Sequence, residues 1–168
     1  MNELSPNDVV ITQADAAESG PVRDALEGRA DIMAMTQATH DAALKPADPG
    51  GLSHGERAAL AARIARLNAD EGLAAHYATL LEEAGADEAV SAMADPAYKG
   101  GGDTRRAALI AYTDLVSVYP RETAAADIEA LKTAGVSDAD IVRLSELNAF
   151  LAYQIRVIAG LKLMKAMA

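Results

Sequence analysis

Apolar residues recur every three or four positions along most of this chain, which is the spacing of amphipathic helices. Residues 53–68 carry the apolar stripe Leu60, Ile64 and Leu67, and the segment that begins at residue 137 carries a longer one. The inward positions expected there are Ile141, Leu144, Leu147, Leu151, Ile155 and Ile158. The pattern predicts an all-α fold, a bundle of about seven helices without a sheet.

Polar residues, prolines and glycines mark where these helices begin and end. Ser53 and Glu56 stand three residues apart and predict a capping box at the start of one helix. Asp70 is placed to cap the next helix. The segments 45–51 and 96–102 are rich in proline and glycine, so both are expected to be loops.

The other helices follow from the same signals. Pro21 at a first helical position predicts a helical region that extends to Leu44, either continuous or broken near Gly28. One face of that region carries Ile32, Met35, Thr39 and Ala43. Further helices are expected over 87–93, 104–119, 123–134 and 137–164.

Composition supports one helical domain. Hydrophobic residues make up 51% of the 168 residues, but aromatic residues only 4%, so the core consists mainly of Ala, Leu, Ile, Val and Met. Such a core suits close-packed helices better than a β-sandwich. Residues 1–19 are expected to be a loose N-terminal lead with a short extended piece at residues 9–11, and residues 20–168 the helical domain.

The charge balance limits the partners. A formal net charge of −10 argues against nucleic acid and anionic lipid, which both require clustered Lys and Arg. The first ten residues, MNELSPNDVV, lack the basic cluster and the apolar run of a signal peptide. Residues 147–164 are apolar, but four polar or charged residues interrupt them, so a buried helix is favoured over a membrane span. The expected location is cytoplasmic.

The chain has no cysteine, which excludes thiol peroxidation, disulfide exchange and cysteine-ligated metals. His40 and His54 stand alone near loop ends, and no histidine has a second ligand at the spacing of a metal motif. Gly100 to Gly102 lack the Lys-Ser/Thr that follows a phosphate-binding loop. No metal and no cofactor are predicted.

Three residues are candidates for catalysis. His76 can move protons near neutral pH, the Tyr77 hydroxyl can orient a substrate oxygen, and Glu56 can act as a general base that faces His76. Each also has a structural interpretation, and that interpretation is favoured. His76 is then a partly buried helix residue bonded to a carbonyl, Tyr77 fills the core, and Glu56 belongs to the capping box.

Asn148, Gln154 and Arg156 are candidates for binding, because they are polar groups on an otherwise apolar helix. Buried polar groups need partners. They either line a pocket with the His-Tyr pair or pair across a subunit interface. The interface is favoured, with Arg156 opposite Glu146 or Asp140 of a neighbouring copy.

Residues 52–85, LSHGERAALAARIARLNADEGLAAHYATLLEEAG, predict two helices that meet at an Asn-Ala-Asp junction. The segment resembles the helical hairpin of the carboxymuconolactone decarboxylase and AhpD-like alkylhydroperoxidase superfamily. Redox-active members carry Cys-x-x-Cys at this junction, with a His after it and a Glu before it. Those two Cys positions fall on Asp70 and Leu73 here, the His position on Tyr77 and the Glu position on Ala58. The whole thiol relay is missing.

The resemblance extends over residues 20–165. The segment 120–138 is similar to the proline-led helix and Gly-x-Ser-Asp restart of peroxidase-related members, and residues 150–164 occupy the place of their closing helix. The resemblance implies an AhpD-like bundle that associates into dimers, trimers or hexamers. The apolar circumference of the last helix and the scattered Met and Leu at 161–167 independently favour an obligate homo-oligomer.

Two functions from different classes stay open. The first is a non-redox small-molecule enzyme, as in the decarboxylase branch of the superfamily, with Arg156 as the central cation for an anionic substrate. The second is a catalytically silent oligomeric protein that binds a ligand or partner. An accessory role in antioxidant or aromatic-degradation metabolism rests on analogy alone.

Overall fold

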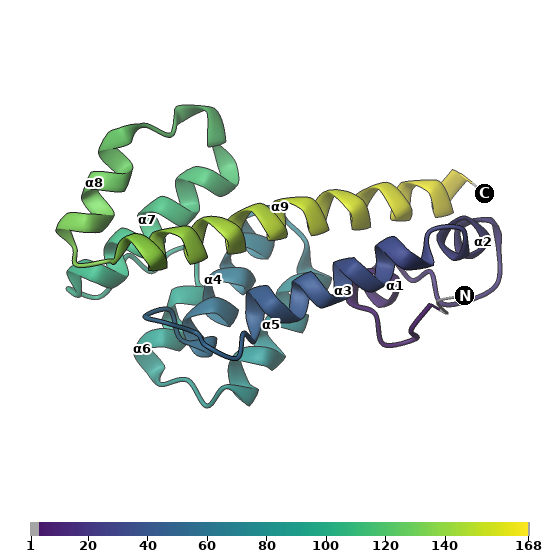
Figure 1. Ribbon diagram of the computed structural model, residues 1–168, viewed down its shortest axis with the longest axis horizontal. Coiled ribbons are helices and arrows are strands. Elements are labelled where there is room, and N and C mark those ends of the chain that lie inside the picture. The colour runs from purple at the N-terminus through teal and green to yellow at the C-terminus, as the bar shows by residue number, and fades with distance from the viewer. Residues whose placement is uncertain (1–3, 168) are drawn as a thin grey trace.

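The computed structural model describes residues 4–167, which form nine α-helices and two short 3₁₀ helices without a strand (Figure 1). The all-α prediction is therefore confirmed. The count exceeds seven because the structure adds an N-terminal helix and separates the region 21–44 at Gly28. The helices are α1 (Val9–Gln13), α2 (Pro21–Glu27), α3 (Ala30–Leu44), α4 (His54–Leu67), α5 (Glu71–Glu83), α6 (Glu88–Ser91), η1 (Ala92–Ala94), α7 (Thr104–Val118), η2 (Pro120–Glu122), α8 (Ala125–Thr133) and α9 (Asp138–Met167).

The expectation of an extended piece at residues 9–11 was wrong, since these residues open helix α1. The Asp8 carboxylate caps this helix by accepting the backbone N–H groups of Val10 and Ile11 at 2.9 and 3.1 Å. Both β-branched side chains are buried against the core, and that burial outweighs their intrinsic preference for strands. Residues 1–3 of the expected lead, and residue 168 of the expected domain, lie outside the described residues.

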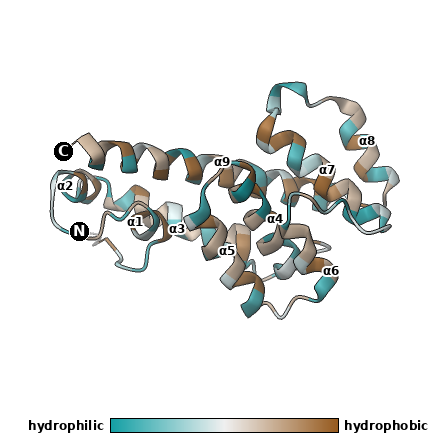
Figure 2. Ribbon diagram, turned by 180° about the vertical axis from the view of Figure 1, so that it is seen from behind, coloured by the Kyte–Doolittle hydropathy of each residue, from teal (hydrophilic) through white to brown (hydrophobic). Residues whose placement is uncertain are grey.

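Helix α9 runs along the whole molecule and packs against α1, α2, α3, α4, α7 and α8 (Figure 1). Its buried stripe includes Leu144, Leu147, Leu151 and Ile158, as the periodicity predicts. Brown and teal segments alternate along it in Figure 2, because the opposite face is exposed. Among the described residues, no helix is long and apolar enough to cross a membrane.

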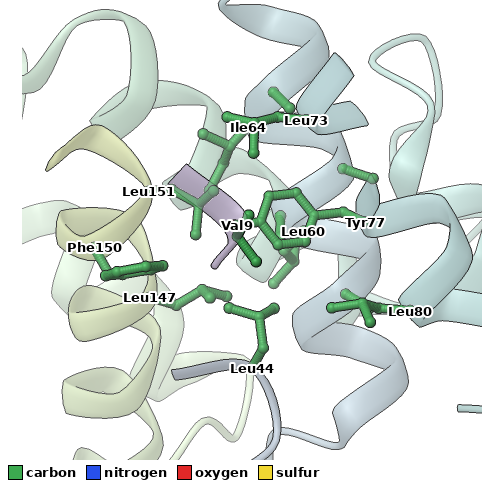
Figure 3. Close-up of a cluster of buried hydrophobic side chains, with 14 of the residues drawn as sticks. Val9, Leu44, Leu60, Ile64, Leu73, Tyr77, Leu80, Leu147, Phe150 and Leu151 are labelled. Atoms are coloured by element: carbon green, nitrogen blue, oxygen red, sulfur yellow. The ribbon is translucent and has the colours of Figure 1, made fainter. Parts of the chain in front are cut away.

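Helices α4 and α5 form a hairpin at the centre of the core (Figure 3). The predicted capping box is present, since the Ser53 hydroxyl accepts the Glu56 N–H at 3.2 Å and the Glu56 carboxylate accepts the Ser53 N–H at 2.9 Å. Asp70 caps α5 through the Leu73 N–H at 3.1 Å. Five alanines of α4 are buried, so neighbouring helices approach its backbone closely: Ala58, Ala59, Ala61, Ala62 and Ala65.

Helix α4 also buries the guanidinium group of Arg63, whose side chain is 0% exposed. It forms a two-pronged ion pair with Asp114 of α7, in which the Nη2–Oδ2 distance is 2.7 Å. The remaining N–H groups donate to backbone carbonyls of the loop 93–98, including that of Pro96 at 3.0 Å. One side chain therefore fixes this loop and ties α4 to α7.

Candidate functional site

The α4–α5 junction is a structural turn. Ala69 adopts a positive φ of 56°, and the Asp70 carboxylate caps α5 by accepting a backbone N–H group. Leu73, in the first turn of α5, is completely buried. Lys162 of α9 stands 3.6 Å from the Asp70 carboxylate and ties the junction to the long helix.

His76 lies on α5 and faces His40 of α3, with the two Nε2 atoms 3.2 Å apart. The Nδ1 atom of His40 lies 3.0 Å from the Asp41 carboxylate and 3.4 Å from the Gln37 amide nitrogen. A carboxylate accepts only, so Nδ1 of His40 carries a proton and its Nε2 accepts the N–H of His76. Asp41, His40 and His76 then form one directed chain of hydrogen bonds, in which the Nδ1 atom of His76 keeps its lone pair.

The electrostatics keep His76 neutral. The pKa of His76 is lowered from 6.5 to about 4, mainly by burial and secondly by the neighbouring His40. Glu83 opposes the shift and Lys45 adds to it. Near neutral pH, His76 is therefore an uncharged imidazole.

Tyr77 is completely buried next to the histidine pair. Its ring lies edge-on to His76 at a centroid distance of 5.0 Å and stacks on His40 at 6.0 Å. The hydroxyl donates to Oε1 of Gln154, and burial raises the pKa of Tyr77 despite this hydrogen bond. The Nε2 atom of Gln154 is buried and has no partner among the described residues. Tyr77 and Gln154 hence join α5 to α9.

Glu56 lies apart from the histidine pair. One carboxylate oxygen serves the capping box, and the other pairs with Nη1 of Arg105 from α7 at 2.5 Å. Arg105 also donates to the Gly51 carbonyl. Glu56 therefore holds the start of α4 against α7 and does not face His76.

Asn148 and Arg156 also lie apart from it. Asn148 is buried, donates to the Leu144 carbonyl at 2.9 Å and accepts the Ser117 hydroxyl at 3.3 Å. Arg156 is exposed and donates to the Ala152 carbonyl of its own helix at 2.8 Å. Of the six candidates, the structure brings together His76, Tyr77 and Gln154 only.

Sequence reasoning missed His40 and treated it as isolated. The adjacent Asp41 is a local signal for a bonded imidazole, but nothing near His40 in sequence indicates its contact with His76. His54, by contrast, donates its Nε2–H to the Pro46 carbonyl at 2.9 Å. Within residues 4–167, no group of three or more His, Asp or Glu side chains is arranged to hold a metal ion.

An open groove with a volume of about 670 Å³ lies between α3 and α9. Most of its walls are apolar, and the hydroxyls of two lining residues, Thr36 and Tyr153, share a hydrogen bond of 2.9 Å. The residues that line it are Ile32, Met35, Thr36, Thr39, Ala42, Ala43, Glu146, Ala149, Phe150 and Tyr153. The Phe150 ring is shared with the histidine pair, since it also lies 6.0 Å from the His40 ring.

Comparison of the chain with models of known protein families, and with curated proteins, found no match.

Proposed function

We propose that this chain is a catalytically silent, homo-oligomeric AhpD-like protein that binds a small apolar ligand in the α3–α9 groove. The observation that carries the proposal is the groove, whose volume of about 670 Å³ lies within the range of small-molecule sites. Ile32, Met35 and Phe150 would shield the ligand from water. The hydroxyls of Thr36 and Tyr153 would orient it, because they can donate or accept hydrogen bonds.

The charge of the groove narrows the ligand class. Glu146 is the one charged side chain among the described residues that line it. Arg156, the cation expected to hold an anionic substrate, is absent from this lining. The proposed ligand is therefore uncharged or cationic, with an apolar body and one hydrogen-bonding group.

A silent protein is favoured over an enzyme because two of the three candidate catalytic groups, Glu56 and Tyr77, already serve the fold. A general base needs a free lone pair, and a general acid a free proton, beside the substrate. The Glu56 oxygens are taken by the capping box and Arg105, and the Tyr77 hydroxyl is taken by Gln154. The thiol relay of the redox-active superfamily members has no counterpart in a chain without cysteine.

Two related dyes test this proposal. N-phenyl-1-naphthylamine is neutral, whereas 1-anilinonaphthalene-8-sulfonate has a similar aromatic body and one negative charge. The neutral dye should bind at least about tenfold more tightly, because Glu146 repels the sulfonate. Glu146→Gln should reduce that difference, and fluorescence titration measures both affinities.

A matched pair of variants locates the dye. Ala42→Phe fills the groove from α3 and should weaken binding of the neutral dye at least about tenfold. Ala111→Phe places the same ring on an exposed site of α7 and should leave the affinity unchanged. Equal affinities in the two variants, or no binding of either dye, would refute the groove as the ligand site.

A second candidate function, a non-redox acid–base enzyme, is favoured by the Asp41–His40–His76 chain. A neutral imidazole oriented by a second imidazole and a carboxylate has the arrangement of a general base with its orienting groups. Hydrolysis of the neutral ester p-nitrophenyl acetate tests it. His76→Gln should abolish any rate above buffer, whereas His54→Gln should retain it, and equal rates in both variants would exclude the histidine pair as the catalyst.

A further inference from the structure

One face of α9 is exposed along nearly its whole length, and its residues recur with alternating spacings of four and three. This face, called the α9 stripe below, is the seam pattern of a helix that packs on another helix. All of its members are solvent-exposed: Val142, Glu146, Ala149, Tyr153, Arg156, Gly160, Leu163 and Met167. Two of the eight members, Glu146 and Arg156, are charged, which is about the same share as in the whole chain.

The α9 stripe is self-complementary when a second copy runs antiparallel to it about Leu151. A two-fold axis through this position brings residue i of one copy opposite residue 302 − i of the other. Tyr153 then faces Ala149, and Val142 faces Gly160. Large side chains meet small ones at these pairs, so the helices can approach closely without overlap.

The two charges of the stripe fix this register. Glu146 and Arg156 lie about 15 Å apart along the helix, too far to pair within one copy. Neither forms an ion pair with another residue in the described part of the chain, where Arg156 bonds only a carbonyl of its own helix. In the register about Leu151 they face each other twice, once on each side of the axis. A shift of one heptad places Glu146 opposite Ala149 or Leu163 instead.

The dimensions also suit a dimer. The stripe from Val142 to Gly160 is about 27 Å long, and the layer of α3 and α9 is about 20 Å wide. This footprint of about 540 Å², enlarged by the relief of the side chains, approaches the roughly 800 Å² per partner of a standard interface. Exposed Met35, at 56% of its surface, lies on the α3 side of the same layer.

We infer that a second copy of this chain docks on the α3–α9 layer, antiparallel about Leu151, and converts the open groove into an enclosed ligand chamber. This inference rests on the proposed function, and the second copy is what closes the proposed ligand site. The partner's Tyr153 stands over Ala149 and forms the outer wall. Two symmetry-related Glu146–Arg156 pairs bound the chamber and cover the side that one copy leaves open. Each Glu146 is then neutralised by the partner's Arg156, so the enclosed chamber favours an uncharged ligand and disfavours the sulfonate dye through the cost of removing its charge from water.

Charge exchange at the two polar positions tests the register. Glu146→Arg and Arg156→Glu each place like charges opposite one another, and each should weaken the dimer at least tenfold in sedimentation equilibrium. The double variant E146R/R156E restores both pairs with reversed polarity and should recover the wild-type dissociation constant. Glu146 and Arg156 are exposed in each single copy, so their exchange should not disturb the fold. Circular dichroism should therefore show the same helicity in every variant. A double variant as weak as the single variants would overturn the inference.

The absence of cysteine permits a second, independent test. Val142→Cys combined with Gly160→Cys should oxidise to a disulfide-linked dimer, because these positions face one another between copies but lie about 27 Å apart within one copy. A side chain at Gly160 meets no atom within 4 Å, so the substitution is tolerated. The single variant V142C keeps both charged residues of the stripe but places its two thiols about 27 Å apart in the dimer, so it should cross-link at least tenfold more slowly. Equal rates in both would overturn the register.

These results separate the inference from the proposed function. A monomer at micromolar concentration that still binds the neutral dye would overturn the dimer and leave the ligand site standing. A dimer with the predicted cross-link that binds neither dye would refute the ligand site and support the interface. A dimer that the charge exchange does not affect would mean that the copies associate through another face.

Discussion

Replacing Arg63 with methionine removes the one charged group that α4 buries completely. Methionine retains much of the length of the side chain but none of its donors. Asp114 then loses its two-pronged partner, and the carbonyl groups of the loop 93–98 lose their shared donor. The variant therefore leaves buried acceptors without hydrogen bonds, which is the costly way to break a buried ion pair.

Removing one partner of a buried pair typically costs about 3–5 kcal/mol of unfolding free energy. Asp114 is 27% exposed and lies 3.4 Å from the Lys99 ammonium, so water and Lys99 relieve part of the penalty. We therefore expect Arg63→Met to lose about 3 kcal/mol, the lower end of that range. For a chain of this size, the loss corresponds to a fall in Tm of about 6–12 °C.

Urea unfolding followed by far-ultraviolet circular dichroism, at one fixed chain concentration, measures this loss. Arg23→Met is the matched control, because the Arg23–Glu27 pair lies at the surface on a single helix. The control should lose less than about 0.5 kcal/mol. If Arg63→Met destabilised the protein no more than the control, the guanidinium would not be holding the loop, and the argument from buried hydrogen bonds would fail.

Two further predictions concern the hairpin. Asp70→Ala removes the cap of α5 and should lower the unfolding free energy by about 1 kcal/mol without changing dye affinity; unchanged stability together with lost dye binding would make Asp70 a site residue instead. His76→Gln should flatten the pH dependence of stability between about pH 4 and 6.5. In that window the unfolded chain binds a proton at His76 and the folded chain does not, so wild-type stability falls as the pH falls. The full difference, about 3.4 kcal/mol at about 1.4 kcal/mol per pH unit, is reduced to about 2 kcal/mol because His76 is partly exposed and screened. Urea midpoints of both proteins at pH 4, 5, 6 and 7 measure it, and parallel profiles would contradict the assignment.

Local signals in the sequence predicted the helix boundaries well. The Ser53–Glu56 box and the Asp70 cap each depend on atoms within four residues, so their sequence spacing is sufficient to locate them. The start of α8 was misplaced at Thr123. Asp127 accepts the Ala124 N–H at 2.7 Å, and the first turn therefore begins two residues later.

Contacts between distant elements could not be predicted in this way. His40 meets His76 across 36 positions of sequence, and their distance depends on how α3 crosses α5. Periodicity also identified the apolar face of α3 that includes Ile32 and Met35, but it did not show whether this face is buried. The structure buries the face with Met33 and His40 and leaves the face with Ile32 and Met35 in the groove. The apolar pattern of a helix does not specify which other helix packs against each face.

The position of α9 in the chain has a consequence for synthesis. This helix packs on six others, yet it follows all of them in sequence (Figure 1). At the usual translation rate of about 5–20 residues per second, residues 9–137 take roughly 6 to 26 s to be made before α9 exists. During that interval the apolar flanks of α3 and α4 have no cover, so nascent chains are exposed to aggregation and to chaperone capture. Expression should therefore depend more steeply on temperature and on chaperone supply than the stability of the finished fold alone would indicate.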